Sequence, residues 1–348
     1  MDDNIDIFTV KRNAIWDWAD EYDQLSKAVY GKNYTFSSAQ AFHSLGKKTS
    51  VVCACMKGKL VAIMMFVHEE ENDTMELGRF MKHPDTPFHA ITMMPEMREV
   101  FAGLLEDPYL LIFGRSRLWV TSEILEYAGL QITGSWITPF SVTSQWGKGK
   151  AHHYIGLYFL PQAGRIQKTM AITTSLSKLL PKWRPIFQQH SFGIEPFEGL
   201  MDRLEDIEEG KFIHRIDNDI IHQGEYANIP CLPDKEIIEK IEHLLREGYV
   251  CMGMYPSWKK IQLDGKLDEV YINYLVLEKK LSGFTSYPIS FPLSELHYQF
   301  TKEYLCDDNQ NHLYYGFPMD KLFRIRTYSY EQKNFLETEQ SKLLQNQS

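Results

Sequence analysis

The sequence has no apolar run that approaches the roughly 20 residues of a membrane-spanning helix. Its first residues, Met1 to Asp6, include three aspartates, whereas a secretory signal carries basic residues at this point. These two absences argue against a helical membrane protein and against a secreted one. We therefore expect a soluble, cytoplasmic protein that does not act at a membrane.

Cysteine is scarce and odd in number, with five residues at positions 53, 55, 231, 251 and 306. Cys53 and Cys55 point to the same face of one predicted strand, and no second pair completes a zinc ligand set. His222 has no second histidine at helical spacing, so a metalloprotease helix is not predicted either. We expect buried, reduced thiols and no metal.

Acidic residues are absent from Tyr127 to Ile194, a segment that contains seven lysines and arginines. Removing these seven charges from the net charge of −9 leaves −16 for the rest of the chain. Two interpretations stay open for the segment. It forms a face for an anionic ligand such as the phosphates of a coenzyme, or it is a region of buried strands with basic loop tips. The overall charge argues against general nucleic-acid binding.

What the chain does contain is an alternation of strand and helix patterns, which is typical of the α/β class. At 348 residues it exceeds one ordinary hydrophobic core, so two domains are predicted, 1–160 and 161–348. In the first, the clearest signal is a hairpin of two apolar runs joined by Lys57-Gly58-Lys59. The first domain has predicted strands at 4–10, 50–56, 60–67, 75–81, 88–94, 109–113, 130–138 and 154–160, with helices at 12–29, 37–45, 95–105 and 121–128.

The second half is less regular. Its best helix is 234–247, where isoleucines and leucines repeat on one face before Gly248. Prolines 181 and 185 reduce 176–189 to two short helical pieces. We further predict helices at 197–209 and 294–305, and strands at 249–255, 269–277, 283–291, 312–317 and 322–328.

The order of the first-half elements resembles that of the GNAT superfamily of acyl-coenzyme A-dependent acyltransferases. Lys57 to Ala62 is similar to the family's turn between its second and third strands. Pro95 to Arg98 is similar to the entry into its pyrophosphate loop, and Ser122 to Leu130 to its late helix. The resemblance covers residues 1–160 and implies a mixed, mostly antiparallel sheet flanked by helices. Tandem GNAT-like chains of this length exist, so the second domain is expected to be α/β too, as a divergent copy or otherwise.

The resemblance also implies a donor site for acetyl-CoA or another acyl-CoA, because a helix N-terminus is a ready site for a pyrophosphate. The family pattern is Arg or Gln, two residues, Gly, one residue, then Gly or Ala. The stretch from Arg98 to Gly103 keeps the first and last positions and has Phe101 at the middle glycine. The predicted donor-binding residues are Met93, Met94, Arg98, Val100, Ala102 and Gly103.

Three residues are candidates for catalysis. The family often has a tyrosine four residues before the late-helix glycine, as acid to the leaving thiolate; here that position is Leu125, and Tyr127 lies nearby. In the second half, Tyr274 and Glu278 share one face of the strand 269–278, where either could deprotonate an amine. A purely structural role for these strand residues is the alternative interpretation.

The predicted function is transfer of an acyl group from acyl-CoA to an amine of a small molecule or peptide, with the acceptor between the two domains. A first alternative is a non-catalytic binding or scaffold protein on a GNAT-like fold, which Phe101 and Leu125 favour. A second is a Fem-type aminoacyl transferase that takes its acyl group from charged tRNA, for which the acid-free basic segment would provide the contact.

Overall fold

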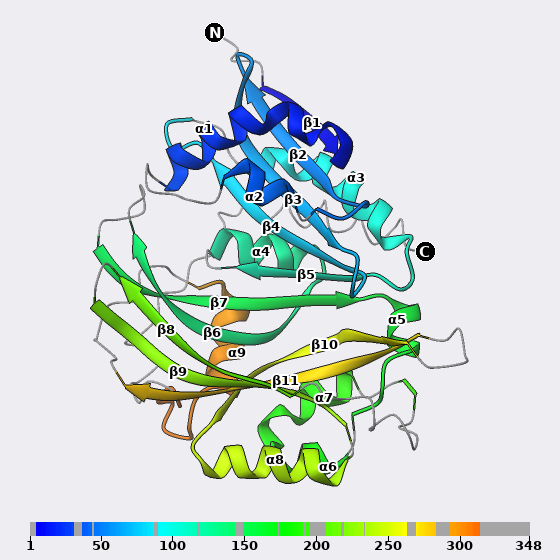
Figure 1. The fold of residues 1–348 in the computed structure, drawn as a ribbon, viewed down its shortest axis with the longest axis vertical. Coiled ribbons are helices and arrows are strands. Elements are labelled where there is room, and N and C mark those ends of the chain that lie inside the picture. Colours follow the sequence, from blue (N-terminus) through cyan, green and yellow to red (C-terminus); the bar gives the residue numbers. More distant parts are fainter. Residues whose placement is uncertain are drawn as a thin grey trace.

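The computed structural model describes residues 5–30, 37–43, 45–86, 90–116, 119–142, 149–172, 174–190, 193–194, 207–216, 219–232, 234–262, 269–282 and 293–313. Their strands form one sheet of 11 strands in the order β1-β2-β3-β4-β5-β7-β6-β10-β11-β9-β8. Helices flank this strongly twisted sheet (Figure 1). The predicted class, α/β with a mixed and mostly antiparallel sheet, is confirmed.

Apart from the strand predicted at 88–94, the first half follows the predicted order of elements. The elements are β1 (Ile5–Lys11), η1 (Arg12–Trp18), α1 (Ala19–Tyr30), α2 (Ser38–His43), β2 (Ser50–Met56), β3 (Lys59–Glu69), β4 (Thr74–Lys82), η2 (Ala90–Met93), α3 (Met94–Leu105), β5 (Leu111–Ser116), α4 (Trp119–Tyr127), β6 (Gln131–Val142) and β7 (Gly149–Pro161). The hairpin at Gly58 is confirmed; this glycine has a φ of +74°. Among the named strands of the described residues, β4 and β5 are the pair that runs parallel, and α3 crosses between them.

The second half continues the same sheet. It contains α5 (Ala163–Gln167), α6 (Thr174–Leu179), η3 (Pro181–Trp183), α7 (Arg184–Gln189), β8 (Glu208–Ile216), β9 (Asp219–Pro230), α8 (Lys235–Arg246), β10 (Val250–Gln262), β11 (Glu269–Ser282) and α9 (Glu295–Tyr304). Asp234 caps α8 by accepting hydrogen bonds from the amides of Glu236 and Ile237. The named strands of this half pair antiparallel.

Three of the four hydrophobic clusters among the described residues hold helices against the sheet. One lies between the sheet and α3 with α4, and includes Leu77, Phe101 and Leu125. Another packs α1 and α2 on the opposite face of β1 to β4. The largest surrounds α6 to α9 and the strands β9 to β11. All five cysteines are buried, as predicted, and none of the five forms a disulfide.

A single residue pair joins the two halves of the sheet in the strand ladder. Gly134 of β6 pairs with Gly253 of β10, and a Cβ atom on Gly253 would lie 2.5 Å from the Cα atom of Gly134. The hydroxyl of Thr133 donates to the carbonyl of Met254 at 2.7 Å beside this pair. The junction therefore requires glycine, because any larger side chain would separate the two strands.

Arg165 of α5 is a second connection between the halves. Its side chain is fully buried, and its guanidinium lies 3.9 Å from the centre of the Tyr271 ring. It donates hydrogen bonds of 2.7 to 3.3 Å to the backbone carbonyls of Asn72, Asp73, Tyr109, Ser257 and Trp258. Asn72 and Asp73 lie in the turn between β3 and β4, Tyr109 lies just before β5, and the last two residues belong to β10.

Two predicted elements were wrong where the structure describes them. Residues 90–94 do not continue a strand but form η2 and the first residue of α3, because Pro95 suits the first turn of a helix. Glu208 and Glu209 begin β8 rather than ending a helix. The rest of the predicted helix 197–209 (apart from Ile207), the strand 283–291 and residues 314–328 lie outside the described residues.

Candidate functional site

The central feature of the first half is the point where the parallel pair β4 and β5 stops. The ladder runs from Thr74–Leu111 to Leu77–Gly114 and ends there. Beyond it, β4 goes on pairing with β3 as far as Lys82, whereas Arg115 and Ser116 of β5 pair with β7. The two strands therefore no longer share hydrogen bonds past Leu77 and Gly114, although both continue.

A bulge in β4 lies just past this point. Against β3, Gly78 pairs with Met65 and Met81 with Ile63, so one residue is inserted. Arg79 within it has a φ of +52°, a conformation that few non-glycine residues adopt. Its guanidinium donates to the carbonyl of Ala41 at 2.6 Å, which holds the bulge against α2. Such backbone strain is concentrated at functional sites.

Different groups flank the end of the ladder on the two faces of the sheet. On the α4 face, Leu125 packs against Gly114, where a Cβ atom would lie 2.7 Å from the leucine side chain. On the other face, Arg115 and Glu76 form an ion pair with Nη2 and Oε1 2.7 Å apart. The Arg115 side chain is 54% exposed, so this ion pair is open to solvent.

The predicted donor-binding residues all lie on or beside α3. Met93 and Met94 are buried, so only their backbone could contact a donor. Arg98, Val100, Ala102 and Gly103 lie within the body of α3, which begins at Met94. The helix therefore starts before the stretch in which the sequence pattern placed the pyrophosphate loop. The assignment of these six residues to a donor stays a prediction.

The predicted catalytic residues fall in two places. Tyr127 ends α4 and packs, half-buried, on the core shared with α3. Tyr274 and Glu278 lie on β11, where Tyr274 pairs with Tyr255 of β10 and Glu278 with Val250. Tyr255 in turn contacts the ring of Phe159, whose neighbour Tyr158 faces α4. Because neighbouring strand residues alternate in direction, Tyr274 and Glu278 lie on the face opposite Tyr127.

This second face is concave and lined with aromatic rings. Trp258 of β10 contacts Phe113 of β5 with ring centres 5.2 Å apart, and Tyr255 contacts Trp136 at 6.1 Å. β5 and β10 are three places apart in the sheet, which on a flat sheet would separate them by about 14 Å. The sheet therefore curls around this aromatic cluster, which we define as Phe113, Trp136, Phe159, Tyr255 and Trp258.

Glu278 has unusual electrostatics at this face. Burial raises the pKa of its carboxyl group to about 8, although its side chain is not fully enclosed. Burial also raises the pKa of Tyr274 to about 12. The Tyr274 side chain is buried, and its hydroxyl has no hydrogen-bond partner among the described residues. A carboxyl group that titrates near neutral pH is suited to accept a proton from an amine.

A polar network that sequence patterns did not indicate lies between α4 and α9. Glu126 accepts hydrogen bonds from the hydroxyls of Tyr158, at 3.0 Å, and Ser294, at 2.6 Å. Burial raises the pKa of Glu126, and burial lowers the pKa of the nearby His297 to about 3. His297 Nε2 lies 2.7 Å from the hydroxyl of Ser135. These residues are far apart in the sequence, so no motif could reveal them.

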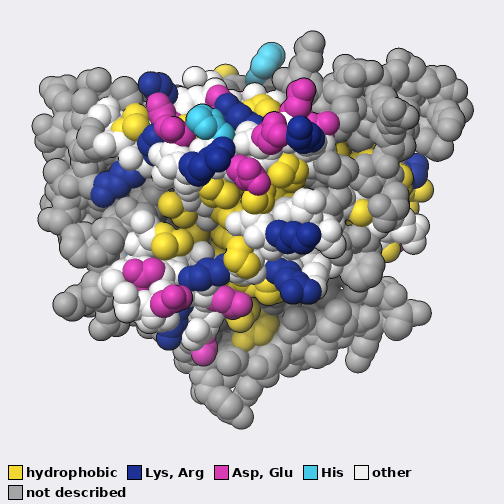
Figure 2. Space-filling view, turned by 90° about the horizontal axis from the view of Figure 1, so that it is seen from below, with side chains coloured by type: hydrophobic (Ala, Val, Ile, Leu, Met, Phe, Trp, Pro, Cys, Tyr) yellow, Lys and Arg dark blue, Asp and Glu magenta, His cyan; other side chains and the backbone are white. Residues whose placement is uncertain are grey.

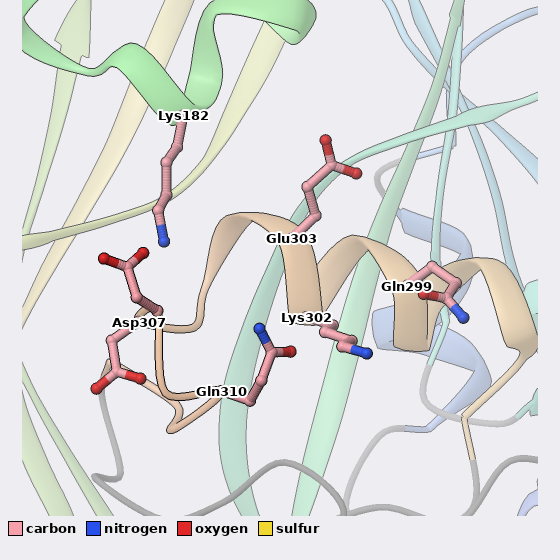
Figure 3. A pocket seen from close by; sticks show the side chains of 7 residues that line it. Lys182, Gln299, Lys302, Glu303, Asp307 and Gln310 are labelled. Atoms are coloured by element: carbon pink, nitrogen blue, oxygen red, sulfur yellow. The ribbon is translucent and has the colours of Figure 1, made fainter.

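A surface pocket of about 420 Å³ lies elsewhere, on the outer side of α9 (Figure 3). Its lining is polar and consists of Lys182, Gln299, Lys302, Glu303, Asp307, Asp308 and Gln310. Lys182 extends from η3 and donates to the carbonyl of Cys306 at 2.5 Å. The pocket contains none of the predicted site residues.

The acid-free segment is only partly exposed. Arg165 is buried, and the ammonium of Lys168 lies 4.7 Å from the centre of the Tyr109 ring. On the face that includes α8, the described charges of both signs are interspersed with hydrophobic side chains (Figure 2).

Among the described residues, no group of three or more His, Cys, Asp or Glu could hold a metal ion. None of the described helices combines the length and apolar character needed to cross a bilayer.

Comparison with known proteins gives matches at the level of structure alone. No family model and no curated protein matches the sequence. Solved structures do match, among them ribosomal-protein-S18-alanine N-acetyltransferase from Escherichia coli, with 12% identity and a TM-score of 0.33 over 46% of this chain and 95% of that one. An acetyltransferase of the GNAT family from Streptococcus pneumoniae matches with 12% identity and a TM-score of 0.33, over 45% and 99%. Spermidine/spermine N-acetyltransferase from Vibrio cholerae matches with 12% identity and a TM-score of 0.31, over 46% and 93%.

GNAT-family N-acetyltransferases are thus among the solved structures that this chain matches, over less than half of its length. The first half itself combines an antiparallel β1 to β4, a parallel pair β4 and β5, and β7 between β5 and β6.

Proposed function

We propose that this protein is an acyl-CoA-dependent N-acyltransferase that acylates an amine of a small molecule or peptide. The observation that carries the proposal is the end of the parallel ladder at Leu77 and Gly114, next to the strained bulge at Arg79. Backbone groups of β4 that face β5 beyond this point have no ladder partner on that strand. Such N–H groups can stabilise the negative oxygen that forms when an amine attacks a thioester carbonyl.

In this proposal the donor lies on the α3 and α4 side and the acceptor on the concave face. Glu278, as a carboxylate, takes the proton from the acceptor ammonium and leaves a neutral amine. The amine nitrogen then forms a bond to the thioester carbon, the carbon–sulfur bond breaks, and the second proton of the nitrogen is released. Tyr127, on the donor side, is the candidate acid that protonates the leaving thiolate.

The proposal is tested by donor binding and by the Glu278→Gln variant. We expect acetyl-CoA to raise the melting temperature of the full chain, and the variant to keep that shift while its acyl-transfer rate falls by about 10²- to 10⁴-fold. Glu239→Gln is the matched control, since Glu239 is exposed on α8 and paired with Lys235. No thermal shift at millimolar acetyl-CoA would contradict the proposal.

A second candidate is a binding protein without catalytic activity. Leu125 favours it, because this apolar side chain packs on Gly114 at the end of the ladder. Phe101 favours it too, because its ring is buried in the core of α3 and α4 and is not available to a ligand. Binding of acetyl-CoA with no turnover over a panel of amines would favour this candidate.

A further inference from the structure

The helix α4 packs on the end of the parallel ladder, and one of its side chains is held by two hydroxyl groups. Leu125 packs on Gly114, the last residue of β5 in that ladder. The next residue, Glu126, is half-buried and accepts hydrogen bonds through Oε1 from the hydroxyls of Tyr158, at 3.0 Å, and Ser294, at 2.6 Å. The contacts that fix Glu126 therefore also fix the helix that packs on the ladder end.

The two hydroxyl donors come from different halves of the chain. Tyr158 lies on β7 and pairs with Gly114 of β5, so its contact with Glu126 stays within the first half. Ser294 is 168 residues away from Glu126 and is the N-cap of α9. Its hydroxyl also accepts a hydrogen bond from the amide of His297 at 3.3 Å. One hydroxyl thus caps α9 and donates to α4, which joins a helix of the first half directly to a helix of the second.

The helix α9 is itself fixed on the sheet, so it can support α4. His297 Nε2 lies 2.7 Å from the hydroxyl of Ser135 on β6. Tyr304, at the other end of α9, packs on Trp183 of η3 with ring centres 5.1 Å apart. All four of these side chains are buried. Because α9 is held at both ends, its N-cap offers Glu126 a donor with a fixed position.

We propose that Glu126 is a positioning residue through which α9 holds α4 at the end of the ladder. In this arrangement the second half of the chain sets the position of Leu125 and of Tyr127, the candidate acid. Glu126 acts through α4, and no bond is made or broken at its carboxyl group. The link between the two helices stands on the contacts alone, whereas its effect on acyl transfer rests on the proposed function.

The link is tested by hydrogen exchange of the full chain, measured by mass spectrometry without a ligand. Ser294→Ala should make the amides of α4 exchange about tenfold faster, because Glu126 loses its donor from α9. Glu126→Ala should have the same effect and leaves the N-cap of α9 in place, so it carries the test even where Ser294→Ala fails to fold. Ser294→Thr keeps the hydroxyl and should exchange like the wild type. The matched control is Asp234→Ala, which removes the cap of α8 and should loosen α8 alone.

Melting temperature and acyl-transfer kinetics separate this role from general stability. Ser294→Ala and Asp234→Ala should both lower the melting temperature, since each loses an N-cap. Of the two, only Ser294→Ala should lower kcat for acyl transfer, about tenfold, with KM for the acceptor unchanged. Glu126→Ala should lower kcat equally, and the double variant Ser294→Ala/Glu126→Ala should be no slower than Glu126→Ala alone, because both changes break one contact.

Three results would count against specific parts of the reasoning. Unchanged exchange of α4 in both Ser294→Ala and Glu126→Ala would overturn the inference, and so would equally fast exchange of α4 in Asp234→Ala. Faster exchange of α4 with an unchanged kcat would refute the positioning role. Faster exchange of α4 in a protein whose wild type transfers no acyl group would support the link and refute the acyltransferase proposal alone.

Discussion

Replacing Arg165 by methionine should destabilise the whole molecule. Methionine fills much of the same volume but donates no hydrogen bond, so the carbonyls of Asn72, Tyr109 and Ser257 lose their charged donor. Each loss costs about 1–3 kcal/mol, and the lost contact with the Tyr271 ring adds about 0.5–2 kcal/mol. Relief from burying a charge offsets several kcal/mol of this sum. We expect a net loss of about 3–5 kcal/mol in the free energy of unfolding.

The measurement is thermal and denaturant unfolding of the wild type and the variant. For a chain of this length, the expected loss lowers the melting temperature by about 4–7 °C. Arg165→Lys should recover little, because an ammonium cannot reach carbonyls on several segments at once. Arg12→Met, at an exposed position, should change stability by less than about 0.5 kcal/mol. A change below about 1 kcal/mol in Arg165→Met would refute the assigned role of this residue.

Three further predictions concern glycine and protonation. Gly253→Val should lower the melting temperature by at least several degrees, because the valine side chain would collide with Gly134. Gly103→Ala, in the exposed interior of α3, should instead stabilise the protein by about 0.5–1 kcal/mol. Equal effects of the two substitutions in thermal unfolding would contradict this prediction. The pKa of Glu278 is about 8 in the folded state, above its unfolded value, so the folded state holds the extra proton between about pH 4.5 and 8. Stability should therefore fall as pH rises through that window, acyl transfer should rise as Glu278 ionises, and Glu278→Gln should remove both trends in unfolding and rate profiles. The pKa of His297 is lowered to about 3, so the unfolded state takes up a proton first as pH falls below about 6.5. Acid should therefore destabilise the protein from that pH downward, and His297→Gln should make the loss shallower in urea titrations at pH 4 to 7.

The sequence predicted those elements in which one local signal dominates. Gly58 between two β-branched runs fixed the β2–β3 hairpin, and the leucine and isoleucine spacing before Gly248 fixed α8. The strand predicted at 88–94 failed because its apolar residues suit a buried helix start as well as a strand, and periodicity alone does not separate the two. The sequence assigned Glu208 to a helix because the helical spacing of apolar residues before it continued up to this position. In the structure, Glu208 instead pairs with β9.

The candidate site was predictable only in part. Alternation along 269–278 correctly placed Tyr274 and Glu278 on one face, since the period of a strand is two. The sequence could not group Tyr255 with these two residues, because the pairing register between β10 and β11 contains two irregularities. The carbonyl contacts of Arg165 have no sequence pattern, because any residue provides a backbone oxygen. Contacts of this kind emerge only from the folded chain.

The close contact between Gly134 and Gly253 has a consequence for how the early and late portions of the chain associate. At the crossing itself, Gly134 and Gly253 meet only through main-chain atoms, so this pair contributes little apolar burial of its own. The cohesion between the early and late portions must therefore come from flanking groups such as Thr133 and Arg165. A chain cut in the segment between β7 and α5 should then yield fragments that recombine only while those flanking bonds can form.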